Sequence, residues 1–271
     1  MNQPPLGDLL QFFIAAMEVY AVLTELDDPA RGRELERIIR GKKALRRIYE
    51  EIYESYASCL KRCPEEGLVV ELGSGGGFVK ERIPEILSTD VHAYGGVDQV
   101  VDAMDMPFDD ESLSALFMLN VFHHIPEVSA FLAEAERVLK PGARLLIVDQ
   151  YPSLLSSPIY RFLHDEPFDP QAREWSFPST GSLSGANGAM AWIVFERDLA
   201  QFRQDFPRLE MQSFRPHSPL RYWLAGGLKG WTLLPGWAFP VATAVDHLLA
   251  GISLQFCSFV NVELRRLRSA S

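Results

Sequence analysis

The sequence predicts an α/β fold in which a mostly parallel sheet is covered by helices on both faces. Three observations predict it. A glycine-dense turn follows a short apolar strand at residues 69–72, further short apolar runs end in polar side chains, and amphipathic segments separate these runs. Strands alternating with helices in this way are typical of parallel α/β sheets.

Each predicted strand delivers a polar side chain to its carboxyl end. The expected strands are residues 69–72, 86–90, 114–120 and 144–149, which carry Glu71, Asp90, Asn120 and Asp149 at or near their ends. Between the last two, residues 126–139 place apolar side chains at helical spacing, and Lys140-Pro141-Gly142 ends that helix. Residues 66–150 therefore alternate as strand, helix, strand, strand, helix and strand.

The turn after the first strand has the pattern Glu-x-Gly-x-Gly-x-Gly, from Glu71 to Gly77. Glycines let the backbone approach a ligand closely. A dinucleotide fingerprint needs a third glycine, but the two available frames place Phe78 or Lys80 in that position. The carboxylate of Glu71 also suits a cationic ligand better than a pyrophosphate, which disfavours a nicotinamide oxidoreductase.

These residues resemble motif I of the class I S-adenosyl-L-methionine (SAM) dependent methyltransferases, and the helix, Leu-Lys-Pro-Gly and strand order of residues 126–149 is a second hallmark of that family. The resemblance covers about a third of the chain strongly. It implies a Rossmann-like, doubly wound, mostly parallel seven-stranded sheet. It also implies SAM as cofactor, with the glycine loop around its methionine part and Glu71 helping to orient it.

Two acids downstream fit the same resemblance. Asp90 follows Glu71 at the distance expected for an acceptor of ribose hydroxyls. Asp102 is assigned to the adenine amine, with Asp98 and Asp105 as rivals. The implied cofactor-binding residues are Glu71, Gly73, Ser74, Gly75, Gly77, Asp90, Asp102, Ala103, Met104 and Asn120.

Histidines supply the candidate catalytic groups. His123 and His124 follow the strand at 114–120, and His164 stands beside Asp165 and Glu166 as a second titratable cluster. A histidine from either cluster could deprotonate a hydroxyl or amine of the substrate. The alternatives are loop-capping or helix-end roles, and methyl transfer can also proceed by positioning alone.

The domain division places a helical cap at residues 1–63, a SAM-binding domain at 64–215 and an apolar helical extension at 216–271. The cap contains amphipathic segments at 8–26 and 45–56. Tyr49, Tyr53 and Tyr56 of the second segment are candidates to reach the cofactor.

Within the SAM-binding domain, residues 150–190 form an insertion expected to act as a lid or substrate loop. After it we expect a strand at 191–195, a helix at 197–206 and a final antiparallel edge strand at 211–214.

The extension is unusually apolar, since Asp246 is the only formally charged residue between Lys229 and Glu263. Prolines and glycines interrupt it, which disfavours a membrane span. Packing on the enzyme, a homodimer interface and peripheral membrane contact through residues 219–268 remain as alternatives.

The composition fits an enzyme whose substrate is a small molecule. A net charge of -10 argues against nucleic acid as partner. The three cysteines suggest reduced thiols, and Cys59 and Cys63 lack a second Cys/His pair, so we expect no metal. No signal peptide is recognised, which predicts a cytoplasmic protein, with membrane association left open. We expect a methyltransferase acting on a metabolite, lipid or glycan intermediate; the alternative is a non-catalytic SAM-binding regulator.

Overall fold

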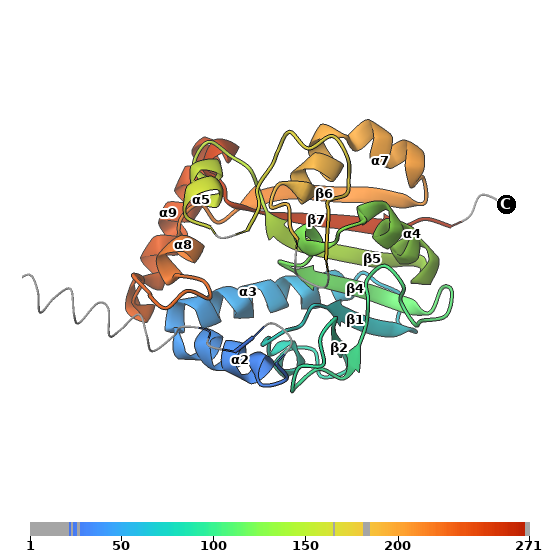
Figure 1. Ribbon diagram of the computed structural model, residues 1–271, viewed down its shortest axis with the longest axis horizontal. Coiled ribbons are helices and arrows are strands. Elements are labelled where there is room, and N and C mark those ends of the chain that lie inside the picture. The colour runs from blue at the N-terminus through green and yellow to red at the C-terminus, as the bar shows by residue number, and fades with distance from the viewer. Residues whose placement is uncertain (1–21, 23, 26–27, 165, 181–184, 269–271) are drawn as a thin grey trace, which may run out of the picture.

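The computed structural model describes residues 22, 24–25, 28–164, 166–180 and 185–268 (Figure 1). The strands form one seven-stranded sheet in the order β3-β2-β1-β4-β5-β7-β6. Neighbouring strands are parallel except where β7 pairs with β5 and β6. The mostly parallel seven-stranded sheet predicted from the sequence is therefore confirmed. The strands are β1 (Leu68–Leu72), β2 (Leu87–Asp90), β3 (Gln99–Val100), β4 (Leu113–Leu119), β5 (Leu139–Gln150), β6 (Leu209–His217) and β7 (Phe259–Arg266).

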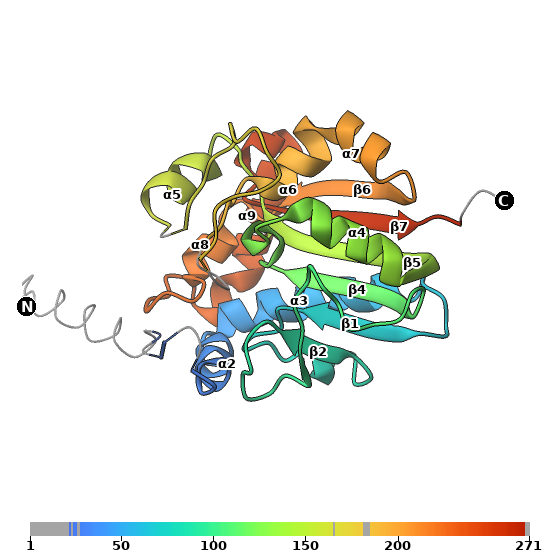
Figure 2. The same ribbon diagram turned by 45° about the vertical axis from the view of Figure 1, so that its right-hand side comes forward.

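Helices cover both faces of the sheet (Figures 1 and 2). On one face lie α2, α3, α8 and α9, and on the other lie α4, α6 and α7, while α5 lies at the end of the sheet near α8 and α9. The α-helices are α2 (Arg31–Gly41), α3 (Lys43–Leu60), α4 (Val128–Val138), α5 (Ser156–Phe162), α6 (Met190–Trp192), α7 (Leu199–Asp205), α8 (Arg221–Ala225) and α9 (Phe239–Ile252).

The central strand β4 shows why the sheet needs helices on both sides. Leu116 and Met118 belong to the core that contains α4, whereas Ala115 and Phe117 belong to the core that contains α3. Successive side chains of a strand point to opposite faces. The continuous apolar run of β4 is therefore buried on both faces of the sheet, as expected of a parallel strand.

Two local predictions were wrong. Residues 191–195 are helical: α6 is followed by a π-helix at Ile193–Arg197, because a short buried apolar run has the same composition in either conformation. The helix expected between β1 and β2 is only a 3-10 turn, Val79–Glu81. The connection is short and contains Pro84, and α3 covers this part of the sheet instead.

The C-terminal segment contributes to the sheet. Residues 211–214 do lie in the antiparallel edge strand β6, as expected, but β7 comes later in the chain and inserts between β5 and β6. Its residues Val260, Val262 and Leu264 are buried within the core. The segment assigned to an apolar extension therefore supplies a strand that was not predicted, although Val260, Val262 and Leu264 alternate with Asn261, Glu263 and Arg265.

The N-terminal cap is described from α2 onward, and the amphipathic segment predicted at residues 8–26 lies largely outside the described residues. The predicted helix at 45–56 is α3. None of the helices in the described ranges has the length and apolar character needed to cross a membrane.

Candidate active site

A cavity of about 700 Å³ opens at the carboxyl ends of β1 and β4. Strand order reverses between these two strands, which is where open α/β sheets bind ligands. All ten predicted cofactor residues line it, together with α2, α3 and the loop that follows β4. The predicted residues on its wall are Glu71, Gly73, Ser74, Gly75, Gly77, Asp90, Asp102, Ala103, Met104 and Asn120.

The glycine loop is shaped for close approach. Gly75 has a φ of +50°, and a Cβ built there would find no atom nearer than 3.9 Å, so the space beside it is open to a ligand. Gly76 serves a different purpose, because a Cβ there would come within 2.4 Å of the Leu35 Cβ on α2. One glycine thus faces the cavity, and its neighbour lets the N-terminal cap pack over the loop.

Two buried carboxylates flank this loop. Glu71 accepts a hydrogen bond from the Ser74 hydroxyl at 2.7 Å, and Asp90 accepts one from the backbone N–H of Gly75 at 3.0 Å. Burial raises the pKa of Glu71 to about 7; the bond from Ser74 opposes this rise and the charge of Asp90 adds to it. Burial likewise raises the pKa of Asp90, against hydrogen bonds from the N–H groups of His92 and Gly75. A cationic ligand would favour the charged form of both acids.

Among the described residues, Asp102 is the only one of the three rival acids that lines the cavity. Its carboxylate accepts a hydrogen bond from the backbone N–H of Met104 at 2.8 Å, which holds the turn that carries Ala103. Asp98 instead pairs with Lys80 and accepts from Ser88, away from the cavity. The geometry favours Asp102 as the acceptor in this segment.

Asn120 combines backbone strain with an unused polar atom. It has a φ of +53°, an unusual value for a residue other than glycine. Its Oδ1 is buried and finds no hydrogen-bond partner in the described part of the chain. A buried acceptor of this kind at a cavity wall fits a ligand that brings its own N–H or O–H donor.

These features fit the cofactor that the fold family implies. SAM carries an ammonium, a carboxylate, two ribose hydroxyls and an adenine amine. Glu71, Asp90, Asp102 and the orphaned Oδ1 of Asn120 offer acceptors, while Arg31 of α2 brings a guanidinium to the same wall. The cavity therefore offers donors and acceptors of the kinds that SAM requires.

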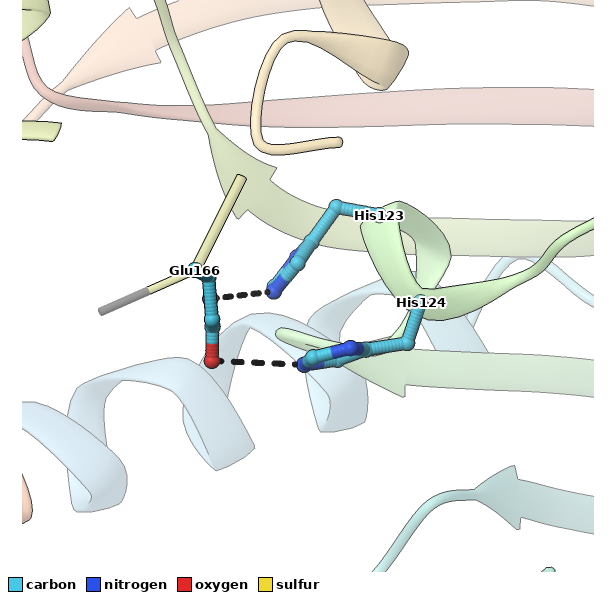
Figure 3. A group of neighbouring side chains, drawn as sticks. All are labelled: His123, His124 and Glu166. Atoms are coloured by element: carbon cyan, nitrogen blue, oxygen red, sulfur yellow. Dashed lines mark hydrogen bonds and ion pairs between the residues drawn. The ribbon is translucent and has the colours of Figure 1, made fainter. Parts of the chain in front are cut away.

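The side chains of His123, His124 and Glu166 form a single cluster (Figure 3). Nε2 of His123 lies 3.1 Å from Oε2 of Glu166, and Nε2 of His124 lies 3.4 Å from Oε1. His124 and Glu166 line the cavity, whereas His123 is buried beneath them. The sequence placed these residues in two separate clusters, and the fold of the insertion brings them together.

Asp149 holds His123 from behind. Its Oδ1 lies 2.6 Å from Nδ1 of His123 and its Oδ2 accepts from the backbone N–H of the same residue. Burial disfavours charge on His123, but Asp149 and then Glu166 outweigh it and raise its pKa to about 10. For Glu166 burial is likewise outweighed, and the hydrogen bonds to the two rings hold its pKa well below the usual range.

Other candidates take supporting positions. Nδ1 of His164 lies 3.4 Å from Oε2 of Glu166, on the side of the insertion. Tyr49 and Tyr53 line the cavity, while Tyr56 stacks on Phe117 in the core. Arg31 and Asp149 were not predicted as site residues, although Asp149 stands at the end of a predicted strand, where the other site acids lie.

Comparisons with known proteins agree with this geometry. Residues 70–147 match the family model described as a methyltransferase domain. A stretch of 63 residues is 44% identical to phthiotriol/phenolphthiotriol dimycocerosates methyltransferase 1 of Mycobacterium ulcerans, covering 23% of each chain. Another of 113 residues is 31% identical to 2-methyl-6-phytyl-1,4-hydroquinone methyltransferase of Synechocystis sp., covering 39% of this chain and 32% of that one.

Among solved structures, geranyl diphosphate C-methyltransferase of Streptomyces coelicolor A3(2), in complex with Mg²⁺, geranyl diphosphate and S-adenosyl-L-homocysteine, superposes with a TM-score of 0.52. It is 14% identical, and the match covers 94% of this chain and 87% of that one. At this identity the likeness shows the fold alone. The matched segments span only about a quarter to a third of the two curated relatives. Residues 70–147 match a methyltransferase domain, and the chain has the fold of the class I SAM-dependent methyltransferases.

Proposed function

We propose that the protein is a SAM-dependent methyltransferase whose acceptor is a small hydrophobic or lipid-like molecule. One observation carries the proposal: the ten residues implied for the cofactor line one cavity, and His124 and Glu166 line the same cavity. SAM supplies an electrophilic methyl group on a sulfonium. The protein's part is to hold the cofactor on the Glu71 and Asp90 side and to present the acceptor on the histidine side.

The acceptor side has the groups needed to orient an oxygen or nitrogen nucleophile. His124 is the histidine exposed to the cavity, His123 is fixed between Asp149 and Glu166, and His164 contacts Glu166 from the insertion. We assign the positioning of the acceptor to these side chains. The named relatives act on phthiotriols and a phytyl hydroquinone, and hydroxyl-bearing hydrophobic molecules of this kind are the acceptors to try first.

The test is incubation with methyl-labelled SAM and a panel of hydrophobic phenols, hydroquinones and polyketide diols, with products detected by mass spectrometry. A labelled product that disappears in Asp90→Ala supports the proposal. Binding of SAM without transfer to any acceptor would favour the alternative, a non-catalytic SAM-binding regulator. Absence of SAM binding would overturn both.

We further propose that the face formed by α9 and the start of α5 contacts a membrane surface. The side chains Val241, Val245, Leu248 and Ile252 follow one stripe of α9, and all are exposed. The buried face of the same helix carries Asp246, whose carboxylate accepts from the backbone N–H of Leu220 at 2.8 Å. The helix thus presents apolar side chains outward and buries its acid, opposite to a helix that meets water.

Neighbouring residues favour a bilayer as the occupant of this face. Trp237 is 83% exposed, and the exposed cations Lys43 and Arg47 lie beside the preceding residue Gly236, with Arg47 donating to the Gly236 carbonyl at 3.0 Å. Tryptophan flanked by cations is typical of side chains that anchor at a lipid headgroup layer. The exposed Leu154 lies in the turn before α5, and its backbone N–H donates to Gln255 after α9, so the apolar face continues toward the start of α5.

Vesicle sedimentation tests this contact. We expect the protein to sediment with vesicles of phosphatidylglycerol and phosphatidylcholine, and Leu248→Ser to release it, while Leu68→Ser, an exposed leucine in β1, has no effect. Equal sedimentation of both variants would contradict the proposal. A concentration-dependent dimer in light scattering that Leu248→Ser dissociates would assign the face to a homodimer instead.

A further inference from the structure

Two histidine rings direct the same kind of nitrogen at one carboxylate (Figure 3). Nε2 of His123 and Nε2 of His124 lie 3.1 Å and 3.4 Å from the two oxygens of Glu166. One ligand atom from each residue can be chosen so that all three lie within 4.8 Å of one another. The three side chains come from the end of β4 and from the insertion, so the fold, and not the local sequence, assembles them.

The opposite nitrogens of the two rings define the tautomers. Nδ1 of His123 faces the Asp149 carboxylate at 2.6 Å, and Nδ1 of His124 faces the Gly185 carbonyl at 3.2 Å. An ionised carboxylate and a carbonyl oxygen only accept hydrogen bonds, so each Nδ1 carries a proton. In the neutral ring, Nε2 then has a free lone pair. The amide Nε2 of Gln150 lies 3.2 Å from Oε2 of Glu166, to which it donates, and 3.3 Å from Nε2 of His123.

With both rings neutral, two lone pairs would point at a carboxylate that is itself an acceptor. This arrangement requires a cation, either a second proton on each ring or one metal ion shared by all three residues. A divalent ion bound at about 2.0–2.2 Å by nitrogen and oxygen leaves about 3.0–3.4 Å between neighbouring ligand atoms in octahedral or tetrahedral geometry. Each ring nitrogen lies at such a distance from one oxygen of Glu166, 3.1 Å from Oε2 for His123 and 3.4 Å from Oε1 for His124, so the two rings face different oxygens of the carboxylate.

We propose that His123, His124 and Glu166 bind a divalent transition-metal ion, with Zn²⁺ as the representative. Two imidazoles and one carboxylate form a typical catalytic set that leaves positions open for substrate. Asp149, which is fully buried, supplies the carboxylate that orients a metal-bound histidine. This proposal revises the expectation of no metal, which rested on cysteine spacing.

The site lies where the acceptor would meet the cofactor. His124 and Glu166 line the cavity that also contains Gly75 and Asp90, so open coordination positions face the same space. A hydroxyl bound to a divalent ion gives up its proton to solvent more readily. We therefore assign the metal to binding an oxygen of the acceptor, a role that rests on the proposed methyltransferase function, whereas metal binding itself does not.

The test is titration of chelator-treated, full-length protein with Zn²⁺ by calorimetry, with Co²⁺ absorption spectra to report coordination. We expect one ion per chain in the wild type. His124→Gln and Glu166→Gln should each weaken binding on the order of 100-fold, since each removes one ligand. The matched control is His247→Gln, an exposed histidine on α9, which should stay within about twofold of wild type.

Circular dichroism and SAM titration accompany each variant. A folded Glu166→Gln protein that binds SAM normally but has lost Zn²⁺ supports the metal site independently of the methyltransferase proposal. A wild type without stoichiometric metal binding, or equal Zn²⁺ affinity in all variants, overturns the metal site and leaves protons as the cations of the cluster. A wild-type protein that does not bind SAM overturns the proposed function and leaves the metal site unaffected.

Discussion

The two sides of the cavity are built in different ways. Most of the cofactor side comes from one stretch of chain, residues 71–104, in which the ends of β1 and β2 and the turns after them present backbone N–H groups and acids, and Arg31 and Asn120 complete it. The acceptor side joins His123 and His124 after β4, Asp149 at the end of β5 and Glu166 in the insertion. The first side depends on backbone shape, and the second depends on how distant segments pack. A substitution on one side of the cavity should therefore impair binding on that side and leave binding on the other side intact.

The largest effect is expected from Gly75→Val. A β-branched residue cannot adopt the φ of +50° without strain, and its side chain would fill the open space beside the loop. We expect SAM affinity to fall by more than about 100-fold, measured by calorimetry, with Zn²⁺ binding retained. The control is Gly251→Val, where a Cβ meets no atom within 4 Å. Unchanged SAM affinity in a folded Gly75→Val protein would refute the role of the loop.

Asp149→Asn should have the opposite effect, weakening Zn²⁺ binding while SAM binding is retained. The amide keeps the shape of the side chain but no longer favours the Nδ1-protonated ring of His123. We expect Zn²⁺ affinity to fall about 10- to 100-fold, as is typical for carboxylates that orient metal-bound histidines. SAM affinity should stay within about twofold. A variant that loses SAM and keeps Zn²⁺ would reverse the assignment of the two sides.

Asp90→Ala tests a single hydrogen-bonding group. Removing one charged acceptor should weaken SAM binding by about 1–3 kcal/mol, with the demethylated product affected equally because the ribose is common to both. Asp98→Ala serves as control, since its carboxylate is engaged by Lys80 and Ser88. Equal dissociation constants for wild type and Asp90→Ala would move the ribose contact to another acid.

The smallest effect is a pH dependence on the cofactor side. Because burial raises the pKa of Glu71 to about 7, protonation on acidification removes the charge that faces a cationic ligand. If only the ionised form binds, SAM affinity should fall about fivefold from pH 7 to pH 6. In the free protein the same raised pKa makes folding less stable as pH rises from about 4.5 through 7. Calorimetric titration with SAM at pH 6 and at pH 7 should show a weaker pH dependence of the affinity for Glu71→Gln than for the wild type. An equal pH dependence in both would exclude Glu71 as the titrating group.

The same contrast explains how much the sequence could predict. The spacing of Glu71, Gly75 and Asp90 follows strand geometry, and the structure places these residues together as expected. The joining of His124 and Glu166 depends on the path of the insertion, which local periodicity does not encode. Strand β7 was missed although Val260, Val262 and Leu264 alternate with polar residues. Its position between β5 and β6 depends on pairing with distant strands, which local periodicity does not encode.

The most direct test of the account is a crystal structure of the protein grown with S-adenosyl-L-homocysteine and Zn²⁺. We expect the ribose hydroxyls within hydrogen-bonding distance of Asp90, the sulfur directed toward His124 and Glu166, and one ion among His123, His124 and Glu166. A ligand bound away from the Gly73–Gly77 loop, or a sulfur directed away from the histidines, would contradict the claim that the two sides serve one reaction.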